Sequence, residues 1–301
     1  MLKQAGIPAS MVLVRTALRG EFDDQPASLA PFDHAIAYVP SMDLFLDGTA
    51  EYTGSTELPA MDRGALALVV DESGKGKLVH LPDAEAAATR RSRKIEAWLQ
   101  PQGGATLEVR MDTTGALASE QRQRYHAKGT QRERLQQDLG AEFAGFEVAP
   151  GKGAVETNDL EDVEQSVKLH VHGRAPGLGR RDGTEISIPV APTRRLVGSF
   201  AALSARRQDI RLHVRSTLED ELSLHLPPGF RVKALPDSAH QETPFGTFAI
   251  SAESTGGKVT VKTKITFDRS RILPAEYAAF RKFCEGADSA FLQRLVIESS
   301  R

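Results

Sequence analysis

The chain has 301 residues, of which 40% are hydrophobic and 26% are charged, and this length is enough for two domains that each bury a core. Its 38 Lys and Arg residues nearly balance its 40 Asp and Glu residues, so the overall charge does not favour a nucleic acid or an anionic membrane as a partner. No run approaches the ~20 apolar residues that a membrane-spanning helix needs. The one cysteine, Cys284, excludes a disulfide within the chain and a zinc site made of several cysteines.

Residues 2–8 predict the end of a helix. Two apolar residues there have helical spacing, and Gly6 and Pro8 follow in the order typical of a helix C-terminus. Isolated helices shorter than ~12 residues are marginal in water, so we expect this segment to complete a longer helix that begins before Met1. The opening residues lack the features of a secretory signal. A signal of this kind is removed when an exported precursor is processed, so export stays open.

The next part of the chain predicts a small unit of short strands that extends over residues 1–85. Its apolar and β-branched runs are separated by segments rich in Gly, Pro and Asp. The predicted elements are a strand at 10–18, a polar loop at 21–31, two short strands within 32–52, and a hairpin at 65–71 and 77–82.

Residues 86–301 predict an antiparallel β-sandwich with two flanking helices. Several strands alternate cleanly between apolar and polar residues, which is typical of strands with one buried and one wet face. The helices are expected at 119–143, which is strongly polar, and at 274–297, which carries aromatic residues at helical spacing. The predicted fold class is therefore α+β, mainly β. The predicted strands are 92–100, 105–114, 165–173, 184–190, 209–217, 221–227, 230–236, 246–255 and 258–267.

The two strands within 32–52 carry a histidine and an aspartate that predict a functional pair. A reversal at residues 40–41 sets His34 opposite Asp47, with their Cβ atoms ~5 Å apart on one face. A carboxylate behind an imidazole fixes its tautomer and stabilises the imidazolium that forms when the ring takes a proton from a nucleophile. Asp33 and Asp43 lie close to the pair and are alternative orienting carboxylates, although strand-end carboxylates that face water are the favoured interpretation. The other face is expected to pack into a core and consists of Ala35, Ala37, Val39, Met42, Leu44 and Leu46.

The same region resembles the second half of the bacterial transglutaminase-core family, a papain-like fold of cysteine acyltransferases and peptidases. In that family a helix with the nucleophilic cysteine ends in an Ala-Gly-Ile-Pro-like motif, and a strand, a His-Ala strand and an Asp-x-Thr motif follow. LKQAGIPASMVLVRT (2–16), His34-Ala35 and Asp47-Gly48-Thr49 match this order. The resemblance implies that His34 is the general base and that Asp47 is its orienting partner.

The rest of the chain also takes part in the resemblance. LHLPPGFRVKALP (224–236) and ILPAEYAAFRKF (272–283) are similar to the β-sandwich that follows the core in large exported bacterial members. The resemblance therefore implies a truncated transglutaminase-like core followed by an accessory sandwich. It also implies a periplasmic or extracellular location, which the chain itself does not indicate.

The nucleophilic cysteine of the family has no counterpart in this chain. It belongs on the helix expected before Met1, together with groups that form the oxyanion hole. Removing the nucleophile of a triad enzyme costs on the order of a millionfold in turnover. Cys284 lies on the apolar side of the helix predicted at 274–297, so we interpret it as a packing residue.

Two hypotheses for the function follow. In the first, the complete protein catalyses thiol-dependent acyl transfer or amide hydrolysis on a protein or peptide, and this chain alone is inactive. An upstream transglutaminase-core segment is then expected in the full-length protein. In the second, the chain is a non-catalytic binding or scaffolding module whose sandwich presents loops or an edge to a partner. No cofactor is expected in either case.

Other motifs carry weaker signals. His170 and His172 share one strand face at a spacing that can chelate a metal, but Lys168 shares that face, and a solvated face is the favoured interpretation. RRSRK (90–94) is too short for a polyanion site and is interpreted as a solvated linker or strand start. The glycine-rich stretches GKGK (74–77) and GLGRRDG (177–183) match no phosphate-binding motif and are interpreted as turns.

Overall fold

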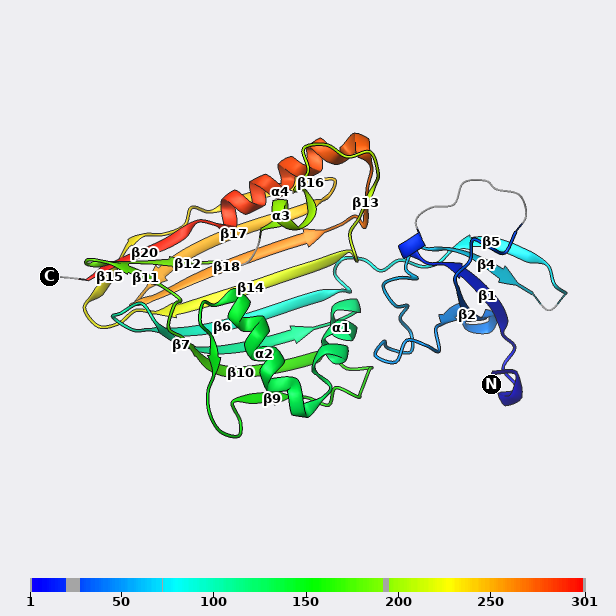
Figure 1. The fold of residues 1–301 in the computed structure, drawn as a ribbon, viewed down its shortest axis with the longest axis horizontal. Coiled ribbons are helices and arrows are strands. Elements are labelled where there is room, and N and C mark those ends of the chain that lie inside the picture. The colour runs from blue at the N-terminus through cyan, green and yellow to red at the C-terminus, as the bar shows by residue number, and fades with distance from the viewer. Residues whose placement is uncertain (1, 20–27, 72, 192–194, 300–301) are drawn as a thin grey trace.

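The structure, a computed structural model, describes residues 2–19, 28–71, 73–191 and 195–299. The fold is mainly β, as the sequence predicted, with a five-stranded N-terminal sheet at one end and a much larger sheet with helices at the other (Figure 1). The loop predicted at 21–31 lies largely outside the described residues. Within the described residues, no helix combines the length and apolar character needed to cross a bilayer.

The N-terminal sheet has the strand order β3-β2-β1-β4-β5, and each neighbouring pair is antiparallel. One face is buried by the loop that follows β3, which places Leu58 against Val12, Val14 and Ile36. The predicted hairpin is present as β4 and β5. A short 3-10 turn, η1 (Leu2–Ala5), precedes the sheet and ends at Gly6, whose φ is +74°. The strands are β1 (Ser10–Arg15), β2 (His34–Val39), β3 (Leu44–Leu46), β4 (Leu66–Val70) and β5 (Gly76–His80).

The prediction of which face of this sheet is covered was wrong, although Val39 on the expected face is buried. The face expected to pack carries Ala35, which is exposed, and Met42, which is 68% exposed. On this same face, Met11 of β1 and Leu78 of β5 are each 55% exposed. The opposite face is buried because the loop after β3 returns across it, and no residue pattern within the strands could reveal that.

The large sheet has nine strands and carries the main core. Its path is β16-β17-β18-β14-β6-β7-β10-β8, with β9 paired to β10 beyond the end of β8. Its pairs are antiparallel, as predicted, except for β14 and β6, which run parallel. The strands are β6 (Arg90–Leu99), β7 (Ala105–Thr113), β8 (Glu147–Val148), β9 (Val155–Thr157), β10 (Val167–Ala175), β14 (Ser216–His225), β16 (Ala239–Thr243), β17 (Gly246–Thr255) and β18 (Lys258–Phe267).

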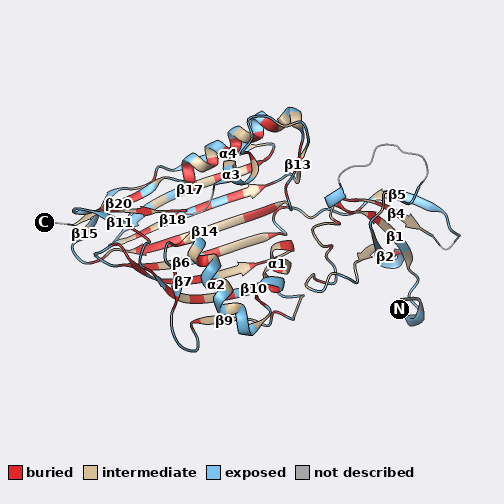
Figure 2. Cartoon of the chain, in the orientation of Figure 1, coloured by how far each residue is buried: buried red, intermediate tan, exposed pale blue. Residues whose placement is uncertain are grey.

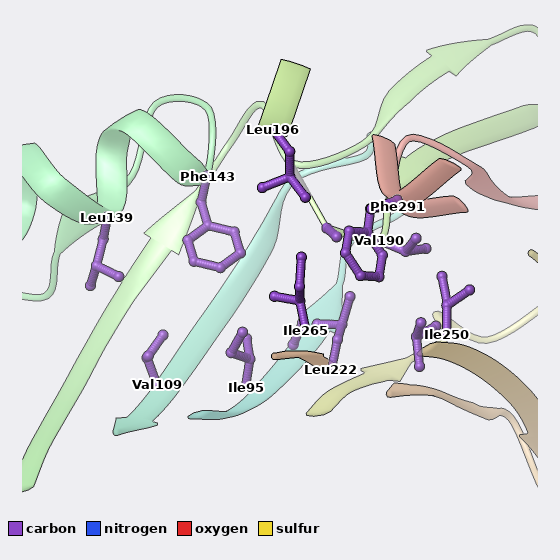
Figure 3. Packing of buried hydrophobic residues seen from close by; sticks show 14 of the residues in the cluster. Ile95, Val109, Leu139, Phe143, Val190, Leu196, Leu222, Ile250, Ile265 and Phe291 are labelled. Carbon is purple, nitrogen blue, oxygen red and sulfur yellow. The ribbon is translucent and has the colours of Figure 1, made fainter. Parts of the chain in front are cut away.

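The inner face of the large sheet packs against helices and a second, four-stranded sheet. Leu139 and Phe143 at the end of α2 and Phe291 of α4 face Ile95 and Ile265 of the strands (Figure 3). Buried residues run along the strands of the large sheet, and exposed residues lie on the outer sides of the helices (Figure 2). The other elements are α1 (Ala116–Tyr125), α2 (Lys128–Glu142), α3 (Leu196–Phe200), α4 (Tyr277–Phe291), β11 (Arg180–Asp182), β12 (Glu185–Pro189), β15 (Phe230–Ala234), β20 (Arg294–Ser299), and the short pair β13 (Ile210–Arg211) and β19 (Arg271–Ile272).

Three predicted elements differ from those observed. The helix predicted at 119–143 is two helices, α1 and α2, tied together by the hydroxyl of Tyr125, which donates to Asp138 Oδ2 at 2.6 Å. The helix predicted at 274–297 ends early, because residues 294–299 pair as β20 between β12 and β15. The strand predicted at 209–217 is interrupted: β13 covers only Ile210–Arg211, residues 212–215 are irregular, and β14 begins at Ser216.

The N-terminal sheet is tied to the large sheet by polar contacts. The buried guanidinium of Arg122 in α1 donates to the backbone oxygens of Tyr52 and Val163, each at 3.1 Å. The guanidinium of Arg63 donates to the hydroxyl of Thr89 at 3.0 Å, just before β6. The two sheets nevertheless keep separate hydrophobic clusters.

Candidate active site

His34 and Asp47 meet at one end of the N-terminal sheet. His34 is the first residue of β2, and Asp47 follows the last residue of β3. His34 Nε2 lies 3.0 Å from Asp47 Oδ2. The predicted contact is therefore present, although the predicted register was wrong by two residues, because a 3-10 turn, η3 (Pro40–Met42), replaces the tight turn. An offset of two residues keeps both side chains on one face, since the side chains of a strand alternate with a period of two.

Asp47 is held as an ionised acceptor. Its side chain is 1% exposed, and its Oδ1 accepts hydrogen bonds from the Thr49 backbone N–H at 2.9 Å and the Thr49 hydroxyl at 2.8 Å. Burial raises the pKa of Asp47, but the hydrogen bonds from Thr49 and His34 outweigh it and hold the pKa below the usual value. Because the carboxylate accepts, Nε2 of His34 carries the proton that it donates, and Nδ1 is the unprotonated nitrogen of the neutral ring.

Asp62, a residue that sequence reasoning missed, completes a cluster of three. Its side chain is fully buried, and Oδ2 lies 3.8 Å from His34 Nε2. Neither carboxylate oxygen has a hydrogen-bond partner among the described residues. Burial, followed by the charge of Asp47, raises the pKa of Asp62 to about 6 despite the opposing effect of His34. No motif or spacing marks this residue, because a loop brings it to the site.

The two alternative orienting carboxylates are engaged elsewhere. Asp33 accepts from the backbone N–H of Thr16 at 2.9 Å and from its hydroxyl at 2.8 Å. Asp43 accepts from the hydroxyl of Tyr38 at 2.8 Å. Asp47 is therefore the carboxylate that is hydrogen-bonded to His34.

Cys284 lies far from this cluster in the fold. It is fully buried within α4, on the inner side of the large sheet. Burial raises the pKa of its thiol to about 12, and a thiol of that pKa is not a nucleophile at neutral pH. Since the chain has no second cysteine, it offers no thiol to His34.

The cluster is suited to moving a proton. Nδ1 of His34 makes no hydrogen bond with any described residue, and the imidazole side chain is 16% exposed. The donor atoms of His34, Asp47 and Asp62 lie within 4.8 Å of one another, which is a spacing that a metal site also shows. We interpret the cluster as an acid–base group, because Asp47 holds Nε2 of His34 and leaves Nδ1 of the same ring to accept a proton.

The remaining sequence candidates fall on the large sheet or in turns. His170 and His172 lie on the open face of β10, and the structure supplies the neighbours that the sequence did not reveal, Glu108 on β7 and Glu156 on β9. The basic run at 90–94 begins β6, where Arg93 is buried and paired. The stretch at 74–77 forms a turn and the first two residues of β5, and the stretch at 177–183 forms turns and contains all of β11.

Of the comparisons with known proteins, one matches the C-terminal part of the chain and another spans nearly all of it. Residues 185–297 match the model of a domain family of unknown function with a solved structure, DUF3858. No curated protein matches the chain. The chain is similar to a crystal structure from Parabacteroides distasonis described as a "putative protease", with a TM-score of 0.45 and 13% identity over 99% of this chain and 41% of that one. The chain thus spans less than half of that protein's length.

Proposed function

We propose that this chain is the His/Asp-bearing part of a transglutaminase-like cysteine enzyme that acts on protein or peptide amides. His34 is the general base, and Asp47 is the residue that orients it. The observation that carries the proposal is the 3.0 Å contact between His34 Nε2 and the buried, ionised Asp47, together with the unengaged Nδ1 on the same ring.

The chemistry follows from this arrangement. Asp47 fixes the tautomer in which the Nδ1 lone pair is free to take the proton of a thiol, and it stabilises the resulting imidazolium. The thiolate adds to the amide carbonyl, and the imidazolium then returns its proton to the departing amine. A thioester remains, and either water or a second amine releases the acyl group. The two releases give hydrolysis and acyl transfer respectively.

The thiol has to come from outside this chain, because Cys284 is buried in α4. We therefore propose that an upstream segment supplies it and that the chain alone is inactive. The exposed apolar face around Met11 and Leu78 supports a further layer of structure on the N-terminal sheet, since apolar faces of this kind mark contact surfaces. We further propose that residues 1–85 and 86–301 are separate domains and, from the resemblance alone, that the protein is periplasmic or extracellular.

The genomic sequence upstream of residue 1 gives the first test. An in-frame cysteine on a helix leading into residues 2–8 supports the proposal. A true start at Met1 without such a helix contradicts it and favours a non-catalytic binding module. That alternative is supported by a hollow of about 560 Å³ on the open face of the large sheet, lined by Lys94, Glu221 and His240 among others.

The second test uses the complete gene product and measures both amine incorporation into a protein substrate and hydrolysis of peptide amides. His34→Ala is expected to lower kcat by about 10⁶-fold and Asp47→Asn by about 10⁴-fold. His225→Ala, on the large sheet, is the matched control and should leave kcat unchanged. Amidase activity of this chain alone that survives Cys284→Ser would overturn the proposal.

A further inference from the structure

The open face of the large sheet carries a second group of histidines and carboxylates, remote from His34. His170 and His172 project from β10, which lies between β7 and the short edge strands β8 and β9. Glu108 on β7 lies directly opposite His172, and Glu156 on β9 lies directly opposite His170. One donor atom from each of Glu108, His170 and His172 lies within 4.8 Å of the other two.

We propose that Glu108, His170 and His172 bind a divalent transition-metal ion, with Zn²⁺ as the preferred ion. Two imidazole nitrogens and one carboxylate oxygen form a ligand set that suits Zn²⁺ and leaves a fourth position open. Tetrahedral coordination places donor atoms about 3.3 Å from one another. His170 Nε2 and Glu108 Oε1 are already 2.9 Å apart, and no two donors of the set are more than 4.8 Å apart, so the remaining separations need to close by at most about 1.5 Å. All three are partly exposed, and this leaves them free to rotate.

Carboxylates on both sides of His170 position its ring for metal binding. Nε2 faces Glu108 Oε1 at 2.9 Å, and Nδ1 faces Glu156 Oε2 at 3.3 Å. A neutral imidazole carries one N–H, so it can donate to only one of the two carboxylates, and its other nitrogen then faces oxygen lone pairs. A cation between Nε2 and Glu108 removes this conflict. Glu156 then accepts the Nδ1 proton, which is the outer carboxylate contact that metal-bound histidines commonly make.

Arg110 competes with a metal ion for Glu108, and one side of the site opens onto a hollow of the sheet surface. Arg110, whose side chain is 59% exposed, forms an ion pair with Glu108 and must release it when the metal binds. His170 and Glu156 also line a hollow of about 500 Å³ on the open face. The fourth position of the ion is therefore accessible to water or to a small anionic ligand.

The test uses this chain purified without a polyhistidine tag and titrated with Zn²⁺ by calorimetry. One ion per chain is expected. His170→Ala and His172→Ala should each weaken binding by more than about 100-fold, and Glu156→Gln, which removes only an outer contact, by about 10–100-fold. Arg110→Ala should tighten binding, because it removes the competing cation. The visible absorption spectrum of the Co²⁺-loaded chain should show the intense bands of four-coordinate Co²⁺.

Two controls locate the ion. His225→Ala removes a histidine on the same face that pairs with Glu96, and His34→Ala removes the histidine of the other cluster. Neither should change Zn²⁺ affinity. Circular dichroism of each variant checks that it is folded, and the surface positions make this the expected result. Absence of stoichiometric binding, unchanged affinity in His170→Ala and His172→Ala, or loss of the ion in His34→Ala would each overturn the proposal.

Discussion

Replacing Asp62 by Asn is expected to stabilise the protein at high pH and to leave its stability unchanged at low pH. The pKa of the buried carboxyl is raised from the ordinary value of 3.8 to about 6. The pKa of this carboxyl is higher in the folded protein than in the unfolded chain. Its contribution to the free energy of unfolding is therefore fully present below the unfolded-state pKa and is lost as the pH rises through the folded-state pKa. A rise of about two units corresponds to about 3 kcal/mol at about 1.4 kcal/mol per unit. Asp62→Asn removes this loss of stability. The free energy of unfolding of the variant should therefore rise above that of the original protein as the pH increases from about 4 to about 7.

Hydrogen exchange of the amides in β1 and β2 measures this effect locally, since the N-terminal sheet has its own hydrophobic cluster. Asp33→Asn is the matched control. Although burial raises the pKa of Asp33, the hydrogen bonds from Thr16 hold it below the usual value. This variant should therefore destabilise the sheet at neutral pH, with the effect fading as the pH falls. If Asp62→Asn destabilised the sheet more at pH 8 than at pH 4, as is expected of Asp33→Asn, the ionised carboxylate would be favourably paired in the native state and the argument would fail.

Three further predictions concern the large sheet. Cys284 should react with a thiol reagent only after unfolding, because it is buried and its pKa is raised to about 12, and rapid labelling of the native chain would contradict this. Arg93→Ala should lower the free energy of unfolding by about 3–5 kcal/mol in urea titrations, because it removes the buried guanidinium that pairs with Asp220 and Glu142; a loss below about 1 kcal/mol would indicate that both carboxylates are solvated. Phe283→Ala, at a fully buried position, should cost about 3–5 kcal/mol in the same assay, whereas Phe283→Leu should cost markedly less.

The inner face of the large sheet could be predicted from the sequence because strand side chains alternate with a fixed period. Val259, Val261 and Ile265 point inward and are buried as their spacing predicted. The aromatic spacing of α4 likewise predicted the buried positions Phe280 and Phe283. Both patterns are local, so neither depends on where the element lies in the fold.

The contact between His34 and Asp47 could be predicted even though its register was wrong. Which face a side chain occupies depends only on parity, and an error of two residues does not change parity. The burial of the other face could not be predicted in the same way. It depends on the loop that carries Leu58 and Asp62 back across the sheet, which is a contact between residues far apart in the chain.

The sequence alone therefore determined the mainly β class, the alternating faces of the strands and the pairing of one histidine with one aspartate, because each follows from the spacing of neighbouring residues. Only the tertiary structure decided that Asp62 joins that pair and that β14 runs parallel to β6. It also decided that Glu108 and Glu156 flank His170. These features arise where separate segments meet, and burial energy over the whole fold, rather than local preference, selects which segments meet.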